Sequence, residues 1–268
     1  MNNTILPFLK LDYLSNTKAY TSGSDSEAHC LDKDFFSNYL YSEKISYVYN
    51  SRGFRDTEWP DSIDELKESI WCFGDSFTVG LGSPIEHTWP YILQKESKRR
   101  CINVSMDGAS NEWIARKVNE VVKEINPDRI IIMWSYCHRD ESPDESLPDN
   151  ERRMWFKYYD DDKSKFLNQF NFNNDLHKFT QARNKLTTKV AIESIIPLAF
   201  TIDKTLPQLD PRLSWHADFN SLNNKLLEFI HPVEQVDFAR DKHHFDILTS
   251  TKFVKKLLDI YPHLLIKS

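Results

Sequence analysis

The stretch that decides the fold is Ile70-Trp71-Cys72-Phe73-Gly74-Asp75-Ser76-Phe77-Thr78. Its apolar first half shows no helical period, and it ends abruptly at Gly74 and Asp75. This pattern predicts a buried strand that runs into a tight turn, with Ser76 on the turn. In an open α/β sheet the ligand crevice lies beyond the carboxyl ends of the strands. We therefore expect the Ser76 hydroxyl to face such a crevice.

The same residues also fit an ordinary turn, because glycine, aspartate and serine all favour turns. The stretch lacks the Gly-x-Ser-x-Gly pattern of α/β-hydrolases, since Thr78 stands at the position of the last glycine. A helix that starts near Ser76 would nevertheless aim its first free N–H groups at the crevice, where they could bind a developing oxyanion. The choice between the two interpretations depends on the rest of the chain.

Apolar runs and helical stripes alternate after this stretch. Further strands are predicted at 101–104, 130–134, 190–196 and 233–238, with Pro197 ending the strand that precedes it. Helices are predicted at 88–98, 111–125, 175–185, 221–230 and 247–261, and Pro232 is expected to stop the fourth of them. This alternation predicts an α/β fold with a doubly wound parallel sheet of about five strands.

The chain divides into a lead-in and one domain. Residues 1–60 are polar, rich in tyrosine and serine, and without sustained periodicity, so we interpret them as an extended segment packed on the domain. Residues 61–268 are expected to form the α/β domain, with an insertion of charged and aromatic residues at about 140–186. The insertion leaves from the carboxyl end of the third strand, so it either caps the crevice or is a solvated surface excursion.

Composition limits the class of protein. A chain of 268 residues can bury a large core without a stabilising disulfide, and its four cysteines are scattered with no Cys-x-x-Cys pair, as in a reducing compartment. The net charge of −6 and the lack of a long basic tract argue against a nucleic-acid partner. There is no basic leader and no run of about 18 apolar residues, so we expect a soluble, cytoplasmic protein with no membrane partner.

A second constellation lies in the loop expected before the last helix. Of the nine histidines, only His244 has an aspartate three residues earlier, Asp241. A carboxylate one turn from an imidazole can accept the Nδ1 hydrogen and leave Nε2 to take a proton from a hydroxyl. Such a pair also arises by chance in an acidic chain, but parallel strands would bring this one to the same sheet edge as Ser76. The pair fits the orienter and base of a triad, and the predicted parallel sheet allows Ser76 to join them.

These blocks, in this order, resemble the SGNH hydrolase superfamily, also called GDSL esterases. The similarity covers about residues 48–260, with Gly74-Asp75-Ser76-Phe77 after the first strand, Gly108 after the second and Asp241-x-x-His244 before the last helix. The resemblance implies a three-layer α/β/α sandwich with a flavodoxin-like sheet. It also implies Ser76 as nucleophile, His244 as base and Asp241 as its orienter. By the same resemblance, the N–H groups of Ser76 and Gly108 would form the oxyanion hole.

One block departs from the family pattern. After the third strand the family usually carries Gly-x-Asn-Asp, whose asparagine donates to the oxyanion, whereas this chain has Ser135-Tyr136-Cys137-His138. One missing donor typically costs about 2.7–4 kcal/mol of transition-state stabilisation. Asn111, Ser135 and His138 are candidates to replace the missing asparagine as a hydrogen-bond donor to the substrate. Arg139 could hold an anionic substrate group or form a surface salt bridge.

We expect no metal and no cofactor, since Cys137-His138 and His243-His244 lack a standard zinc-ligand spacing. The predicted function is a serine esterase that removes an acyl group, such as acetyl, from a small-molecule or carbohydrate ester through an acyl-enzyme. Two alternatives stay open. One is acyl transfer to a sugar hydroxyl, and the other is a carbohydrate-binding or assembly protein that has lost efficient chemistry on the same fold.

Overall fold

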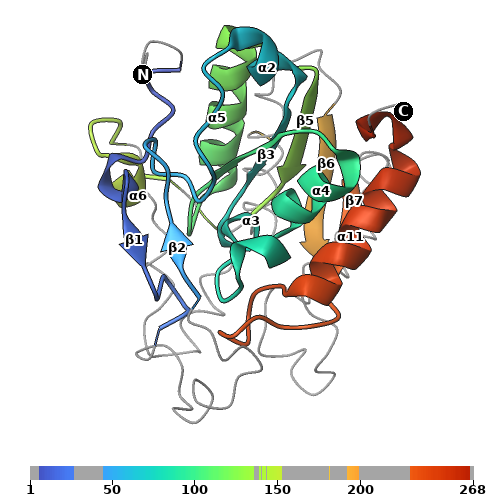
Figure 1. Ribbon diagram of the computed structural model, residues 1–268. Coiled ribbons are helices and arrows are strands. Elements are labelled where there is room, and N and C mark those ends of the chain that lie inside the picture. The colour runs from blue at the N-terminus through green and yellow to red at the C-terminus, as the bar shows by residue number, and fades with distance from the viewer. Residues whose placement is uncertain are drawn as a thin grey trace.

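The computed structural model describes residues 6–26, 45–135, 139, 141–142, 144–152, 181, 192–198 and 230–265. Its centre is a five-stranded sheet in which every neighbouring pair of strands is parallel (Figure 1). The strands lie in the order β4 (Cys101–Ser105), β3 (Ile70–Gly74), β5 (Arg129–Met133), β6 (Ile192–Leu198) and β7 (Ile230–Glu234). The α/β class predicted from the sequence is therefore confirmed.

Helices and short strands surround this sheet. The α-helices are α2 (Ile63–Glu68), α3 (Ser76–Val79), α4 (Trp89–Ser97), α5 (Asn111–Glu124), α6 (Asp149–Arg152) and α11 (Ile247–Ile260). The 3₁₀ helices are η1 (Asp12–Leu14), η2 (Ile85–His87) and η4 (Pro262–Leu264), and β1 (Lys18–Ala19) pairs antiparallel with β2 (Tyr47–Val48). Over the described residues, no helix has the length and apolar character needed to cross a membrane.

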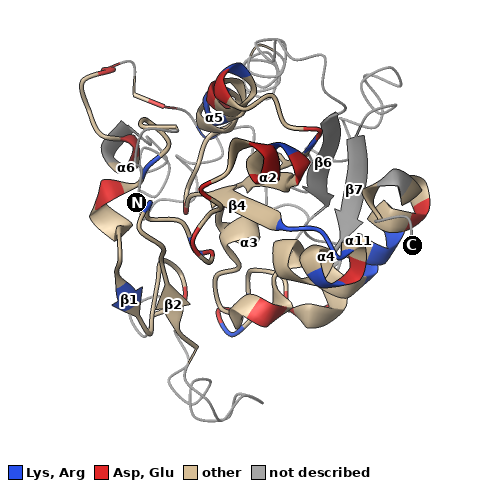
Figure 2. Ribbon diagram, turned by 45° about the horizontal axis from the view of Figure 1, so that its top comes forward, with Lys and Arg blue, Asp and Glu red and all other residues tan. Residues whose placement is uncertain are grey.

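The sheet has a core on each face, because successive side chains of a strand point to opposite sides. Trp71 and Phe73 belong to one core with α5, whereas Ile70 and Cys72 belong to a second core with α4 and α11. Figure 1 shows α4 and α11 together on one side of the strands and α5 on the other. In Figure 2, β4 carries no charged residue, while α5 and α11 carry charges of both signs. The helices thus pack amphipathic faces onto an apolar sheet.

Local signals explain where the helices begin. Ser110 accepts a hydrogen bond from the backbone N–H of Trp113 at 3.1 Å and so caps α5. Thr88, the first residue of the helix predicted at 88–98, stands at the N-cap of α4, but it makes no side-chain cap. Its hydroxyl donates instead to the carbonyl oxygen of Ile85 at 2.8 Å, which ties the helix to η2.

Part of the lead-in contributes to the core. Leu6, Leu9 and Leu11 are buried in the same cluster as Trp71 of β3. The backbone N–H of Leu11 donates to the carbonyl oxygen of Arg52 at 2.8 Å, which joins two parts of the lead-in. These residues therefore share a hydrophobic core with the sheet.

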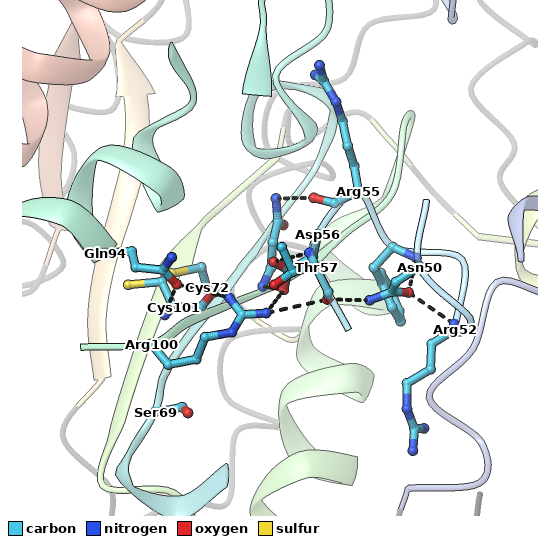
Figure 3. A network of polar contacts seen from close by, with 12 residues as sticks. Asn50, Arg52, Arg55, Asp56, Thr57, Ser69, Cys72, Gln94, Arg100 and Cys101 are labelled. Carbon is cyan, nitrogen blue, oxygen red and sulfur yellow. Dashed lines mark hydrogen bonds and ion pairs between the residues drawn. The ribbon is translucent and has the colours of Figure 1, made fainter. Parts of the chain in front are cut away.

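A later part of the lead-in, residues 50–57, covers the edge of the sheet at β4. Oδ2 of Asp56 accepts hydrogen bonds from the backbone N–H of Asn103 at 3.0 Å and from Nη2 of Arg100 at 2.8 Å (Figure 3). Burial raises the pKa of Asp56, although the charge of Arg100 acts in the opposite direction. The carboxylate satisfies a backbone group of an edge strand that would otherwise be unpaired.

The prediction that Pro197 ends the fourth strand is wrong, because β6 continues through it to Leu198. β5 pairs with β6 only as far as Ile195, whereas β7 pairs with β6 from Ser194 to Leu198, so beyond Ile195 only β7 pairs with β6 among the described strands. Proline lacks an N–H and is tolerated in a strand where only one side needs hydrogen bonds. Pro197 occupies such a position.

The prediction for the last strand is also wrong in its boundaries. The sequence places a helix at 221–230 and a strand at 233–238, whereas β7 begins at Ile230 and includes Pro232. Among the described strands β7 has a single neighbour, β6, so it is an edge strand and can accommodate proline. Residues 221–229, the predicted helix at 175–185 apart from Gln181, and most of the insertion lie outside the described residues.

Candidate active site

The carboxyl ends of β3, β4 and β5 lie at one edge of the sheet. In the parallel register Gly74 lies opposite Ser105. The segments that follow the three strands contain Ser76, Gly108 and Ser135 in turn. The edge is therefore the one at which open α/β sheets bind ligands.

Ser76 is buried and is the first residue of α3. The side chain of Asp75 caps this helix by accepting a hydrogen bond from the backbone N–H of Phe77 at 3.1 Å. A Cβ at Gly74 would lie 2.0 Å from Oγ1 of Thr78, so only glycine lets the helix start directly at the end of the strand. The N–H of Ser76 has no acceptor within the helix and is available at this end.

Asp241 and His244 form a buried pair, as the sequence predicts. Nδ1 of His244 lies 2.5 Å from Oδ2 of Asp241, and the side chains are 3% and 0% exposed. Oδ1 of Asp241 accepts the backbone N–H groups of His243 and His244, both at 3.0 Å. Burial alone would raise the pKa of Asp241, but the charge of His244 and the hydrogen bonds from His244 and Ser24 hold it well below its usual range. The carboxylate is therefore ionised and fixes the imidazole.

The ring of His244 lies against the residue next to the proposed nucleophile. Its centroid is 4.5 Å from that of Phe77, which follows Ser76 in α3. Nε2 of His244 is buried and has no hydrogen-bond partner among the described residues. The hydrogen bond between the Ser76 hydroxyl and Nε2 of His244 is therefore not formed in this structure. Catalytic hydrogen bonds are often long or absent before substrate binds.

The loop 239–244 is fixed against the turn that follows α3. The backbone N–H of Arg240 donates to the carbonyl oxygen of Gly82 at 3.0 Å. A Cβ at Gly82 would lie 2.8 Å from Cβ of Ala239, so the two segments are in close contact. The loop also closes on itself, because the N–H of Ala239 donates to the carbonyl oxygen of His244 at 2.8 Å. The loop that carries His244 is thus held by the turn that directly follows the helix of Ser76.

Arg55 holds that turn through hydrogen bonds to its backbone carbonyl oxygens. Its Nη1 donates to the carbonyl oxygens of Val79 at 3.1 Å and Gly80 at 2.6 Å, and its Nη2 donates to that of Ser83 at 2.8 Å. The guanidinium lies over the ring of Tyr47, with 4.3 Å to the centroid. Burial lowers the pKa of Arg55, and these carbonyl oxygens supply the acceptors that water would otherwise provide.

Asn111 and Ser135, two of the residues predicted to contact substrate, bond to each other. Oδ1 of Asn111 accepts the backbone N–H of Ser135 at 2.8 Å, and its Nδ2 donates to the carbonyl oxygen of Ser135 at 3.1 Å. The amide thus joins the start of α5 to the end of β5. A role for either residue toward substrate stays a prediction.

Arg139 forms a buried ion pair where a surface salt bridge or a substrate contact was expected. Its Nη1 lies 2.7 Å from Oδ2 of Asp75, and the side chains are 8% and 1% exposed. The Ser135 hydroxyl donates to the same oxygen of Asp75 at 2.8 Å. The residue before Ser76 is therefore held by the segment after β5. Cys137 and His138, including the zinc alternative and the predicted substrate contact, lie outside the described residues.

Sequence analysis missed the contribution of the N-terminal region. The hydroxyl of Ser24 donates to Oδ2 of Asp241 at 2.6 Å, although the two residues are 217 positions apart. The neighbouring Asp25 pairs with Arg240, the residue before Asp241. In the sequence, Ser22-Gly23-Ser24-Asp25 is only a turn signal, and nothing in it indicates a partner so distant.

Comparisons with known proteins found no matching family model and no matching curated protein. Similar solved structures include a member of the lipolytic G-D-S-L family from Veillonella parvula, at 17% identity and a TM-score of 0.48, covering 73% of this chain and 98% of that one. A lipase/acylhydrolase from Enterococcus faecalis is similar at 13% identity and a TM-score of 0.43, and the match covers 75% of this chain and 98% of that one. A family 3 carbohydrate esterase from Clostridium thermocellum is similar at 14% identity and a TM-score of 0.40, and the match covers 74% of this chain and 100% of that one. A likeness this distant does not transfer an activity to this chain.

Proposed function

We propose that this protein is a serine ester hydrolase of the SGNH type. Ser76 is the nucleophile, His244 the base and Asp241 its orienter. The observation that carries the proposal is the buried Asp241–His244 pair, whose second nitrogen is unpaired among the described residues and whose ring contacts Phe77 beside Ser76. An imidazole that is bound to a carboxylate on one side and unpaired on the other is arranged to accept a proton.

The strand order supports the proposed fold. Numbered along the chain, the five strands of the sheet lie in the order 2-1-3-4-5, which is that of flavodoxin-like sheets. Packing of α5 on one face and of α4 and α11 on the other is what a three-layer α/β/α sandwich requires. In such a fold the strand switch point lies where β3 and β5 end, beside Ser76.

The proposed reaction has two steps. Oγ of Ser76 attacks the ester carbonyl while its proton passes to Nε2 of His244, and the backbone N–H groups of Ser76 and Gly108 bind the oxyanion. The imidazolium then gives the proton to the departing alkoxide, which leaves an acyl-enzyme. In the second step His244 takes a proton from water while the water oxygen attacks the acyl group. When the acyl–Oγ bond breaks, the imidazolium returns that proton to Oγ of Ser76, and the carboxylic acid is released. The substrate is proposed to be a small-molecule or carbohydrate ester.

A fluorophosphonate probe tests the proposal, because it labels only an activated serine. The wild-type protein should be labelled at Ser76, as located by mass spectrometry of the digested protein. Ser76→Ala should abolish the labelling, and His244→Ala should slow it strongly. Ser83→Ala removes another buried serine and should leave the labelling unchanged. A folded wild-type protein that does not react, or a Ser76→Ala variant that still does, would contradict the proposal and favour the binding-protein alternative.

A further inference from the structure

A short turn in the lead-in, residues 22–25, lies against the proposed base and its orienter. Two backbone hydrogen bonds of 3.1 and 2.9 Å between its end residues close the turn. Gly23 has φ +53°, and a Cβ there would lie 2.8 Å from both Oδ2 of Asp107 and Cδ1 of Leu81. Glycine thus lets the turn insert between the segment after β4 and the segment after α3.

A buried ion pair anchors this turn to the loop that carries the base. Nε and Nη2 of Arg240 lie 2.8 and 2.6 Å from the two carboxylate oxygens of Asp25, which is fully buried. The hydroxyl of Tyr47 donates to Asp25 at 2.6 Å and accepts the backbone N–H of Gly82 at 2.8 Å. Burial and the nearby Asp25 carboxylate raise the pKa of Tyr47, so the phenol stays a neutral donor. Because Arg240 directly precedes Asp241, the pair fixes the turn relative to the orienter.

Ser24 is the residue of the turn that reaches the site. Its hydroxyl donates to Oδ2 of Asp241 at 2.6 Å, and the same oxygen faces Nδ1 of His244 at 2.5 Å. Oγ of Ser24 lies 3.4 Å from that nitrogen. With the two backbone N–H groups on Oδ1, the carboxylate of Asp241 therefore has four hydrogen-bond partners. Every one of them constrains the position of the oxygen that aligns the imidazole.

We propose that Ser24 is a positioning residue of the active site, which acts through its hydrogen bond to Asp241. The inference rests on the proposed hydrolase function. A donor on Oδ2 restrains the carboxylate against rotation and withdraws negative charge from the oxygen that faces His244. Without that donor, Asp241 should stabilise the imidazolium more strongly and hold the ring less firmly. The less firmly held ring slows proton transfer from Ser76, and the more stable imidazolium keeps the base protonated, and so inactive, up to a higher pH.

Several charged and titratable groups surround the pair and stay the same when Ser24 is changed. Among the described residues they are Arg240, Lys242 and His243 on the loop, Asp25 on the turn and Asp107 after β4. From α3 the ring of Phe77 faces His244 and carries no charge. Asp25 is already neutralised by Arg240. A shift in pH dependence on removal of the Ser24 hydroxyl would therefore come from the Asp241 carboxylate.

The test compares three variants on a short p-nitrophenyl ester. Ser24→Ala should lower kcat about tenfold with KM within about twofold, a loss well short of the roughly 10²–10⁴-fold contribution of a general base. The acid limb of kcat/KM should move up by about half a pH unit. Ser24→Thr keeps the hydroxyl and should restore most of kcat. Ser22→Ala is the matched control, since the Ser22 hydroxyl pairs with Tyr49 at 3.4 Å, and it should behave as wild type.

A second measurement does not depend on turnover. In protein with ¹³C-labelled histidine rings, the NMR titration midpoint of His244, assigned with His244→Ala, should move to higher pH in Ser24→Ala and not in Ser22→Ala. Equal profiles for these two variants would overturn the inference, while loss of turnover in Ser76→Ala would still support the hydrolase. A loss of kcat that is the same at every pH and accompanies a lower Tm would also overturn it, because that is the signature of a merely structural role. If Ser76→Ala keeps full turnover, the hydrolase proposal fails, and a shifted titration would then still establish the coupling of Ser24 to His244.

Discussion

The described structure contains two Asp–His pairs of similar construction, Asp241–His244 and Asp246–His87. Nδ1 of the histidine lies 2.5 Å from the carboxylate in the first pair and 2.8 Å in the second. Each carboxylate also accepts a serine hydroxyl, from Ser24 at 2.6 Å in the first pair and from Ser83 at 3.0 Å in the second. By these contacts alone, both pairs resemble the orienter and base of a triad.

The pairs differ in their surroundings. His244 is 3% exposed and its ring contacts Phe77 beside Ser76, whereas His87 is 14% exposed and belongs to η2. Asp246 is the N-cap residue of α11, so the second pair joins two structural elements. An Asp–His contact is therefore common structural chemistry. What distinguishes a base is the position of its other nitrogen relative to a nucleophile.

The largest expected effect is the loss of the proposed nucleophile, Ser76, which lies beside the first pair. Ser76→Ala should lower kcat for ester hydrolysis on the order of 10⁴-fold or more, because members of a triad act as a unit. Steady-state assays on a short p-nitrophenyl ester measure this change in kcat. Ser83→Ala removes the serine of the second pair and should leave kcat within about twofold of wild type. Equal losses in the two variants would remove the distinction between the pairs.

Replacing each histidine separates the pairs directly. His244→Ala should lower kcat nearly as much as Ser76→Ala, and the double variant should be little worse than either, since the residues share one step. His87→Ala should reduce kcat less than about threefold, because a hydrogen bond that joins two structural elements contributes mainly to stability. The measurement is kcat for the four proteins under one set of conditions. A large loss in His87→Ala with unchanged Tm would place the base in the second pair.

The pH dependence of stability gives a third comparison. The pKa of Asp241 is lowered in the folded state, so its stabilising contribution is present above the unfolded value of about 3.9 and is lost as pH falls below it. Asp241→Asn should therefore lower the free energy of unfolding by about 1–3 kcal/mol at pH 7. That difference from wild type should shrink below about pH 4. Urea unfolding at both pH values measures it, and a difference that grows in acid would contradict the assignment.

The smallest expected effect concerns the serine of the second pair. The Ser83 hydroxyl lies 3.1 Å from the carbonyl oxygen of Phe245 and 3.0 Å from Oδ1 of Asp246. Ser83→Ala should lower the free energy of unfolding by about 1 kcal/mol, the usual net contribution of a buried hydrogen bond. Thermal unfolding followed by circular dichroism measures it. A change in the pH profile of hydrolysis would show that this pair also takes part in the reaction.

The sequence predicts those features that depend on local pattern. The apolar run before Gly74 fixes β3, and the Asp-x-x-His spacing brings Asp241 and His244 together because three residues make about one turn. The helices predicted to begin at 88 and 111 begin in the structure at Trp89 and Asn111, because their apolar stripes are local patterns as well. The predicted approach of Ser76 to His244 follows from parallel strands that share one edge.

Features that depend on distant neighbours could not be predicted. Whether a strand tolerates Pro197 depends on how far β5 extends beside it, which no local pattern contains. Arg139 looks like a surface or substrate-binding residue until the position of Asp75 is known. Ser24 gains its partner only through tertiary packing of a turn that has no periodic signal. Such contacts join segments of the site that are far apart in the sequence, whereas sequence patterns describe only one segment at a time.

The pair formed by Asp25 and Arg240 also bears on how the protein matures, since its members are 215 positions apart. During synthesis the aspartate leaves the ribosome long before its arginine exists, and a buried carboxylate without a countercharge is strongly unfavourable. The N-terminal turn is therefore expected to stay undocked in the nascent chain until the late loop has been translated, as contacts this remote form slowly. An incompletely synthesised chain would then be inactive, and activity would appear only when the last part of the chain has folded.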